Sequence, residues 1–395
     1  SGQVARIIGR DLNNVTYSET RNRSYRGALG ITGDIAENLS FDFSAVAMHT
    51  DLTRIGQGYI RIQNLLDAIA RGTYNFVNPS ANSQDVLDQV MPENRSVATS
   101  DQVEFRGYVS TGLAELPGGT LNVALGGSIR YEAVDAPSFN DDVNGPTQRY
   151  FTFNAFGTEG SRWVKSVFGE IKAPIIDMLE LSASARYDSY SSGQDAFSPK
   201  VGFTFQPIQQ VLLRGAYSEG FRIPSFGEAN ALPTTGYVTT NPTVFNDAFL
   251  AQYSTATDTC SLATFSDCPT YIRNDSYGQT TLASPNLEPE KSRSFTAGIF
   301  VEPIRNFSLS VDYYNIKKTN VITSPSNAPA LIAYYSGQPI PDGYTVIPGA
   351  PDPNFPNATP TAAFVESQLI NANTQRTSGL DFAVDGAIEF SPGFS

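Results

Sequence analysis

The chain has 395 residues, of which 16% are charged and 40% are hydrophobic, and its formal net charge is −13. Such an acidic chain offers no basic surface to a phosphate backbone, so we expect no nucleic-acid partner. One histidine and two cysteines cannot form a four-ligand zinc site, and we expect no metal centre, no cofactor and no catalytic activity.

A period of two dominates the pattern of apolar and polar residues. From Leu179 to Tyr187 every odd position is apolar and every even position is polar or charged. This alternation predicts strands with one face in an apolar medium and one in a polar medium. Leu181 should therefore face lipid near mid-membrane, and Ser182 should face a lumen. The same pattern recurs in eleven segments, at residues 20–30, 39–49, 102–113, 119–132, 161–173, 178–190, 196–206, 210–220, 291–302, 305–318 and 378–390.

The lengths of these segments and their connections indicate an all-β, antiparallel transmembrane β-barrel. The segments suit membrane strands of about 9–11 residues better than soluble strands of about 5–6. Short turns alternate with longer connections, as in outer-membrane barrels. The longer connections are at residues 50–101, 133–160, 191–195, 221–290 and 319–377. A large secreted β-sandwich or β-solenoid is the alternative.

The first long connection contains a helical pattern. Ile62, Leu65, Leu66 and Ile69 are spaced by three or four residues. Residues 60–70 are therefore predicted to form a short amphipathic helix, which we expect to pack against its own loop.

Two segments carry more specific motifs. Residues 214–226 contain R-x-x-Y-S-x-G-F-R-x-P, and residues 285–298 contain P-x-L-x-P-E-K-S-x-x-x-x-x-G. Both closely resemble signatures of TonB-dependent outer-membrane receptors. Besides Arg214, the principal matching residues are Tyr217, Ser218, Gly220, Phe221, Arg222, Pro224, Pro285, Leu287, Pro289, Glu290 and Lys291.

The resemblance implies a transporter in the bacterial outer membrane. The family folds as a 22-stranded barrel with an N-terminal plug, binds a scarce extracellular solute and imports it with energy relayed by TonB. Here we expect residues 1–395 to be a single domain, a partial barrel of about eleven strands that lacks the plug and the C-terminal strands. The expected partners are outer-membrane lipid, the solute and, through the missing N-terminal region, TonB.

We expect the motif residues to be structural rather than to contact ligand. Arg222 and Pro224 follow a strand that ends at Gly220, and Pro289 suits a strand start because it cannot donate a ladder hydrogen bond. Glu290 and Lys291 are expected to pair inside the lumen.

Cys260 and Cys268 are expected to form a disulfide. They lie eight residues apart in a long connection, and an oxidising compartment favours such a bond. A reactive thiol pair is the alternative, but residues 259–270 contain no cation to activate it. The run at residues 140–145 could hold Ca²⁺ but lacks a closing bidentate Glu, so we favour a solvated acidic turn.

The two longest connections are rich in aromatic residues and poor in cations. This composition suits a neutral or weakly charged solute, such as an oligosaccharide or a bulky chelate, better than a phosphate-rich one. Self-packing of the loops is an equal alternative. The candidate ligand contacts are Tyr237, Phe245, Tyr253, Tyr271, Tyr277, Tyr334, Tyr335 and Tyr344. A siderophore, cobalamin-like chelate, oligosaccharide or peptide would fit active uptake, while a passive porin or a secreted glycan-binding protein are the competing functions.

Overall fold

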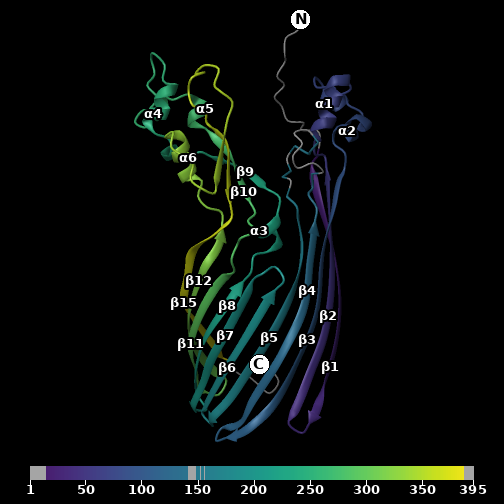
Figure 1. Cartoon of the computed structure of the whole chain (residues 1–395), viewed down its shortest axis with the longest axis vertical. Helices are drawn as coiled ribbons and strands as arrows, with labels where there is room; N and C mark the ends of the chain where they lie inside the picture. The colour runs from purple at the N-terminus through teal and green to yellow at the C-terminus, as the bar shows by residue number, and fades with distance from the viewer. Residues whose placement is uncertain (1–14, 141–147, 152, 155, 387–395) are drawn as a thin grey trace.

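The computed structural model describes residues 15–140, 148–151, 153–154 and 156–386. Its main feature is an antiparallel sheet of eleven strands, which we call the wall (Figure 1). In spatial order the strands are β1 (Tyr17–Ala36), β2 (Leu39–Gln57), β3 (Asn94–Leu116), β4 (Gly119–Ala136), β5 (Thr158–Ile176), β6 (Leu179–Tyr190), β7 (Asp195–Ile208), β8 (Val211–Arg222), β11 (Glu290–Ile304), β12 (Phe307–Thr323) and β15 (Ile370–Gly386). Within these described residues the wall is not closed, and β1 and β15 form its edges.

The wall confirms the predicted all-β, antiparallel fold class. Each of the eleven predicted segments lies on a strand of the wall. The last segment was predicted to end at residue 390, and its residues 387–390 fall outside the described part of the chain. Several strands are longer than predicted, and β3 has 23 residues. Its first eight residues are mostly polar on both faces, so they lack the alternation that marks a membrane strand.

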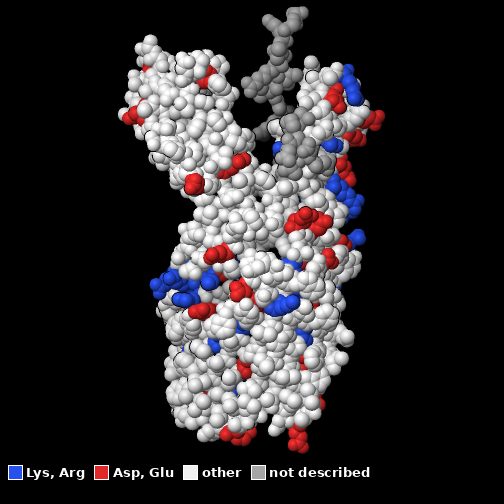
Figure 2. Space-filling model, viewed as in Figure 1, with Lys and Arg blue, Asp and Glu red and all other residues white. Residues whose placement is uncertain are grey.

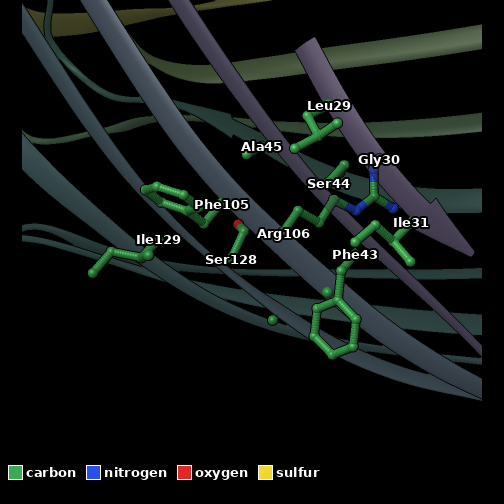
Figure 3. Close-up of a pocket in the computed structure, with 12 residues that line it drawn as sticks. Leu29, Gly30, Ile31, Phe43, Ser44, Ala45, Phe105, Arg106, Ser128 and Ile129 are labelled. Carbon is green, nitrogen blue, oxygen red and sulfur yellow. The ribbon is translucent and has the colours of Figure 1, made fainter.

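The two faces of the wall differ as the alternation predicts. One face, which we call the outward face, exposes large apolar side chains along the lower wall, and most of the lower side margins are uncharged in Figure 2. A shallow depression in this face is lined by Leu29, Phe43, Phe105 and Ile129 (Figure 3). Exposed apolar residues in this number are what contact with acyl chains requires.

Short turns and long connections are sorted to opposite ends of the wall. The turns that join β1 to β2, β3 to β4, β5 to β6, β7 to β8 and β11 to β12 lie at the lower end in Figure 1. Helices α1 (Ile62–Arg71) and α2 (Gln84–Val90) lie at the upper end and pack against each other. The predicted helix at residues 60–70 is thus confirmed as α1. Among the described residues, no helix is long and apolar enough to cross a membrane.

A second domain-like unit, which we call the cap, stands above β8 to β15 in Figure 1. It is a four-stranded sheet in the order β13-β14-β10-β9, with short helices beside it. Its elements are β9 (Thr234–Thr239), α4 (Asp247–Leu250), α5 (Thr270–Arg273), β10 (Ser276–Leu282), α6 (Ala328–Tyr335), β13 (Tyr344–Pro348) and β14 (Ala362–Gln368). The sequence did not predict this sheet, because its strands are short and pair across two separate connections.

Candidate ligand-binding site

The inward face of the wall carries networks of charged groups. Arg162 of β5 donates to Glu132 of β4, and Arg130 pairs with the same carboxylate at 3.3 Å. Lower on the wall, Arg186 donates to the buried Asp188 at 2.8 Å. The face predicted to line a lumen therefore presents fixed polar groups, which can contact a hydrated solute or a polar filling of the barrel.

One inward ion pair spans an intervening strand. Arg214 of β8 donates through Nε and Nη2 to the two carboxylate oxygens of Asp312 on β12, at 2.9 and 2.6 Å. Gly298 of β11 is paired with both residues and lies between them. A Cβ at this glycine would lie 1.9 Å from Asp312 Oδ1. The two side chains can meet across β11 because Gly298 has no side chain to separate them.

Gly298→Val should destabilise the full-length protein by about 1–3 kcal/mol, because the added side chain would displace the carboxylate and strain the wall. The measurement is denaturant unfolding in lipid vesicles. Ala297→Val is the matched control, since it adds atoms to the outward face of the same strand, where lipid can accommodate them. Equal destabilisation by the two variants would contradict this account of Gly298.

The two sequence signatures meet at Arg222, the last residue of β8. Its guanidinium donates to Glu228 of α3 (Phe226–Asn230) at 2.8 and 2.9 Å and to Glu290, the first residue of β11, at 2.9 and 2.8 Å. Ser225 and Glu228 form a capping box that fixes the start of α3. Hydrogen bonding from Arg222 lowers the pKa of the Glu290 carboxyl. These contacts join β8, α3 and β11 where the wall meets the cap.

The expectation that Glu290 and Lys291 pair in the lumen is wrong. The two residues are consecutive in β11, so their side chains leave opposite faces of the sheet. Glu290 points inward to Arg222, whereas Lys291 lines an outward groove with Arg293 and Lys317.

Other motif residues also have partners within the protein. Phe221 packs against Tyr190, with ring centroids 6.2 Å apart. The carbonyl of Pro224 accepts a hydrogen bond from Arg162 at 3.0 Å, and Leu287 is buried. These contacts are all made within the protein, and they agree with the structural role predicted for the motif residues.

The cap has a hydrophobic core of its own, and this core takes up several predicted ligand contacts. The buried ones are Phe245, Tyr253, Tyr277 and Tyr335. Tyr334 and Tyr344 are half-buried and donate to backbone carbonyls, each at 2.8 Å. Tyr237 and Tyr271 are 72% and 47% exposed. These two rings can meet a solute without rearrangement of the cap.

Buried cross-links hold the cap together. Cys260 and Cys268 are joined by a disulfide, and both are buried in the cap core. The buried Asp275 accepts a hydrogen bond from the Thr240 hydroxyl at 2.6 Å. Burial raises the pKa of the Asp275 carboxyl, although hydroxyl donors such as Thr240 act in the opposite direction.

Because its folded-state pKa is raised, Asp275 favours folding most when it is protonated, and this contribution is lost as the pH rises through the folded-state pKa. Asp275→Asn cannot ionise. We therefore expect the variant to gain stability relative to the wild type between about pH 4 and about pH 7. Thermal unfolding of the full-length protein at both values measures this difference. A difference that is independent of pH would contradict the assignment.

The acidic run at residues 140–145 lies outside the described residues except for Asn140. The amide of this residue donates to the Phe153 carbonyl at 2.7 Å. Elsewhere in the described chain, no cluster of three or more His, Cys, Asp or Glu residues has an arrangement able to hold a metal ion.

Comparison with known proteins identifies relatives of the whole fold. A family model described as TonB dependent receptor-like, beta-barrel matches residues 3–395. The siderophore receptor PirA from Acinetobacter baumannii is similar in structure, with a TM-score of 0.55 at 12% identity, over 93% of this chain and 42% of that one. A mutant of the ferric enterobactin receptor PfeA from Pseudomonas aeruginosa gives a TM-score of 0.50 at 12% identity, over 98% and 52%.

Identities this low show the fold alone. The chain spans about half the length of these solved structures, and no curated protein matches it. The family match covers nearly every residue and includes both signatures. The chain thus belongs to the TonB-dependent receptor β-barrel family, whose members lie in the outer membrane of Gram-negative bacteria.

Proposed function

We propose that this protein binds a scarce extracellular solute and imports it across the outer membrane with energy supplied through TonB. The observation that carries the proposal is the cap, which is an ordered unit with its own core and disulfide at the end of the wall opposite the short turns. A passive pore needs no such unit, whereas a receptor needs a fixed surface to select its solute.

The exposed rings of the cap indicate the class of solute. Tyr237 and Tyr271 present aromatic surface to solvent, which suits the planar groups of a metal chelate or the faces of a sugar. Two similar solved proteins are named a siderophore receptor and a ferric enterobactin receptor. These names support a ferric siderophore as the first solute to test, with oligosaccharide, cobalamin-like chelate and peptide next.

The test is uptake of radiolabelled iron from ferric siderophores by cells that produce the full-length protein, with and without a working TonB. Active uptake predicts accumulation only when TonB is present. Replacing both Tyr237 and Tyr271 with Ala should reduce accumulation, while Tyr187→Ala, which removes an exposed ring from the outward face of β6, should leave it unchanged. Accumulation of no tested solute in the TonB-positive cells would count against the proposal.

A passive porin is the competing function, and conductance separates the two. In a planar bilayer the full-length receptor should stay closed, because a receptor admits solute only during driven transport. Large, steady conductance would favour the porin and overturn active uptake. The family consists of receptors and transporters rather than enzymes, and our proposal includes no catalytic step.

A further inference from the structure

A row of charged residues crosses four neighbouring strands on the outward face. Glu219 of β8 is paired with Arg293 of β11, Arg293 with Lys317 of β12, and Lys317 with Arg376 of β15. Lys291, two residues from Arg293 on β11, adds a fourth cation on the same face. We call the four cations the basic row.

The basic row is poorly neutralised by the protein. Arg293 is 71% exposed and pairs with Glu219 at 3.2 Å. Arg376 donates to the Asn315 side-chain oxygen at 3.3 Å, which is not an ion pair. In the described chain, no carboxylate lies within ion-pair distance of Lys291 or Lys317. Like charges directly opposite each other destabilise a sheet, so this arrangement calls for an anion from outside the protein.

The level of the basic row on the wall suggests where that anion comes from. Immediately below the row lie the exposed rings of Tyr217, Phe295 and Tyr313, of which Tyr217 and Phe295 are paired. Below these rings the outward residues are apolar and include the aliphatic Ile299 and Leu309. Aromatic rings of this kind mark the boundary between acyl chains and water. Figure 2 shows the resulting cluster of Lys and Arg at mid-height, on the side formed by β11, β12 and β15.

A groove beside the basic row has room for a headgroup. Its volume is about 560 Å³, and its lining includes Lys291, Arg293 and Lys317 together with the rings of Tyr187 and Phe197. Asp195 and Glu219 also line it, and both accept hydrogen bonds from tyrosine hydroxyls. Three cations of the row line the groove and outnumber these two acids, and Arg376 lies next to Lys317 on β15, so the site favours an anion.

We propose that the basic row binds a phosphate group of a lipid in the outer leaflet. Arginine and lysine both make charge-assisted hydrogen bonds to phosphate, and arginine can do so with two parallel bonds. The aliphatic and aromatic surface below the row would receive the acyl chains of the same molecule, which a free phosphate ion could not use. The proposal does not depend on which solute the protein imports.

The test is native mass spectrometry of the full-length, delipidated protein, titrated with three probes. These are lipid A with its phosphates, the same lipid after dephosphorylation, and inorganic phosphate alone. Lys317→Gln combined with Arg376→Gln should weaken binding of the phosphorylated lipid about tenfold or more. Lys318→Gln is the control for position, because it removes one positive charge from the opposite face of β12. We expect this variant to bind the phosphorylated lipid as tightly as the wild type does.

The outcomes distinguish the sources of phosphate. Tight binding of the phosphorylated lipid alone, lost in the double variant and restored by Lys317→Arg with Arg376→Lys, supports the proposal. Equal binding of the phosphorylated and dephosphorylated lipids would overturn it, as would equal binding to the double variant and the wild type. Equally tight binding of inorganic phosphate would replace the lipid with a free anion. The heat-dependent gel mobility of each variant checks that it has folded.

Discussion

Ala183→Arg should destabilise the full-length protein in a bilayer by about 2–4 kcal/mol, because it places a charge on the lipid face near mid-membrane. Ala183 lies on the outward face of β6, between the apolar Ile171 and Val201 of the neighbouring strands. Leu181, which the sequence pattern placed at this depth, faces outward as predicted, but it is only the third residue of β6 and lies closer to the short turn than Ala183.

Ser184→Arg is the matched control for Ala183→Arg. Ser184 is the next residue of β6 and faces inward, where its neighbours are Glu170 and Lys200. An added guanidinium there meets a charged, hydrated surface, so the free energy of unfolding should change by much less. Denaturant unfolding from lipid vesicles measures both variants. Equal costs would show that the two faces have been assigned incorrectly.

Arg222→Gln should lower the stability of the full-length protein by about 2 kcal/mol, because it leaves two carboxylates close together without their shared cation. Glu290 is largely buried at this point, with 13% of its side chain exposed. The expected loss of stability is smaller than for a fully buried ion pair, because the Arg222 side chain is half-exposed and water screens its charge. Lys165→Gln is the control, because it removes one exposed cation that has no ion pair among the described residues.

The effect of Arg222→Gln should also depend on pH. The pKa of Glu290 is lowered in the folded state, so its contribution is present above the unfolded-state pKa and is lost as the pH falls through the folded-state value. The stability difference between wild type and variant should therefore shrink below about pH 4. Thermal unfolding across this range measures it. A difference that grows on acidification would rule out the ion pairs as its source.

The fold was predictable to the extent that it depends on local pattern. Apolar and polar side chains alternate along a membrane strand, so a run that starts with Leu179 and Glu180 indicates both the strand and the direction in which each of its faces points. The helix at residues 60–70 was likewise visible in its own spacing. The extracellular ends of the strands were not, because both of their faces meet water or loops and no alternation is required there.

The candidate site was less predictable, because its parts come from distant segments. Phe245 and Tyr237 look alike as loop aromatics in the sequence, yet one is buried in the cap core and the other is exposed. Pairing of β10 with β14 decides that difference, and it joins two separate connections. No local signal shows which aromatic residues the resulting core will cover.

The sequence by itself thus determined the number of strands in the wall, the lipid-facing side of each of them and the end of the wall that carries the long loops. These features follow from a short-range period and from the order of the segments. Tertiary structure alone decided the cap, the ion pairs of Arg222 and the alignment of Arg293, Lys317 and Arg376. The physical reason is register, because only the pairing of strands far apart in the chain sets which charges lie side by side.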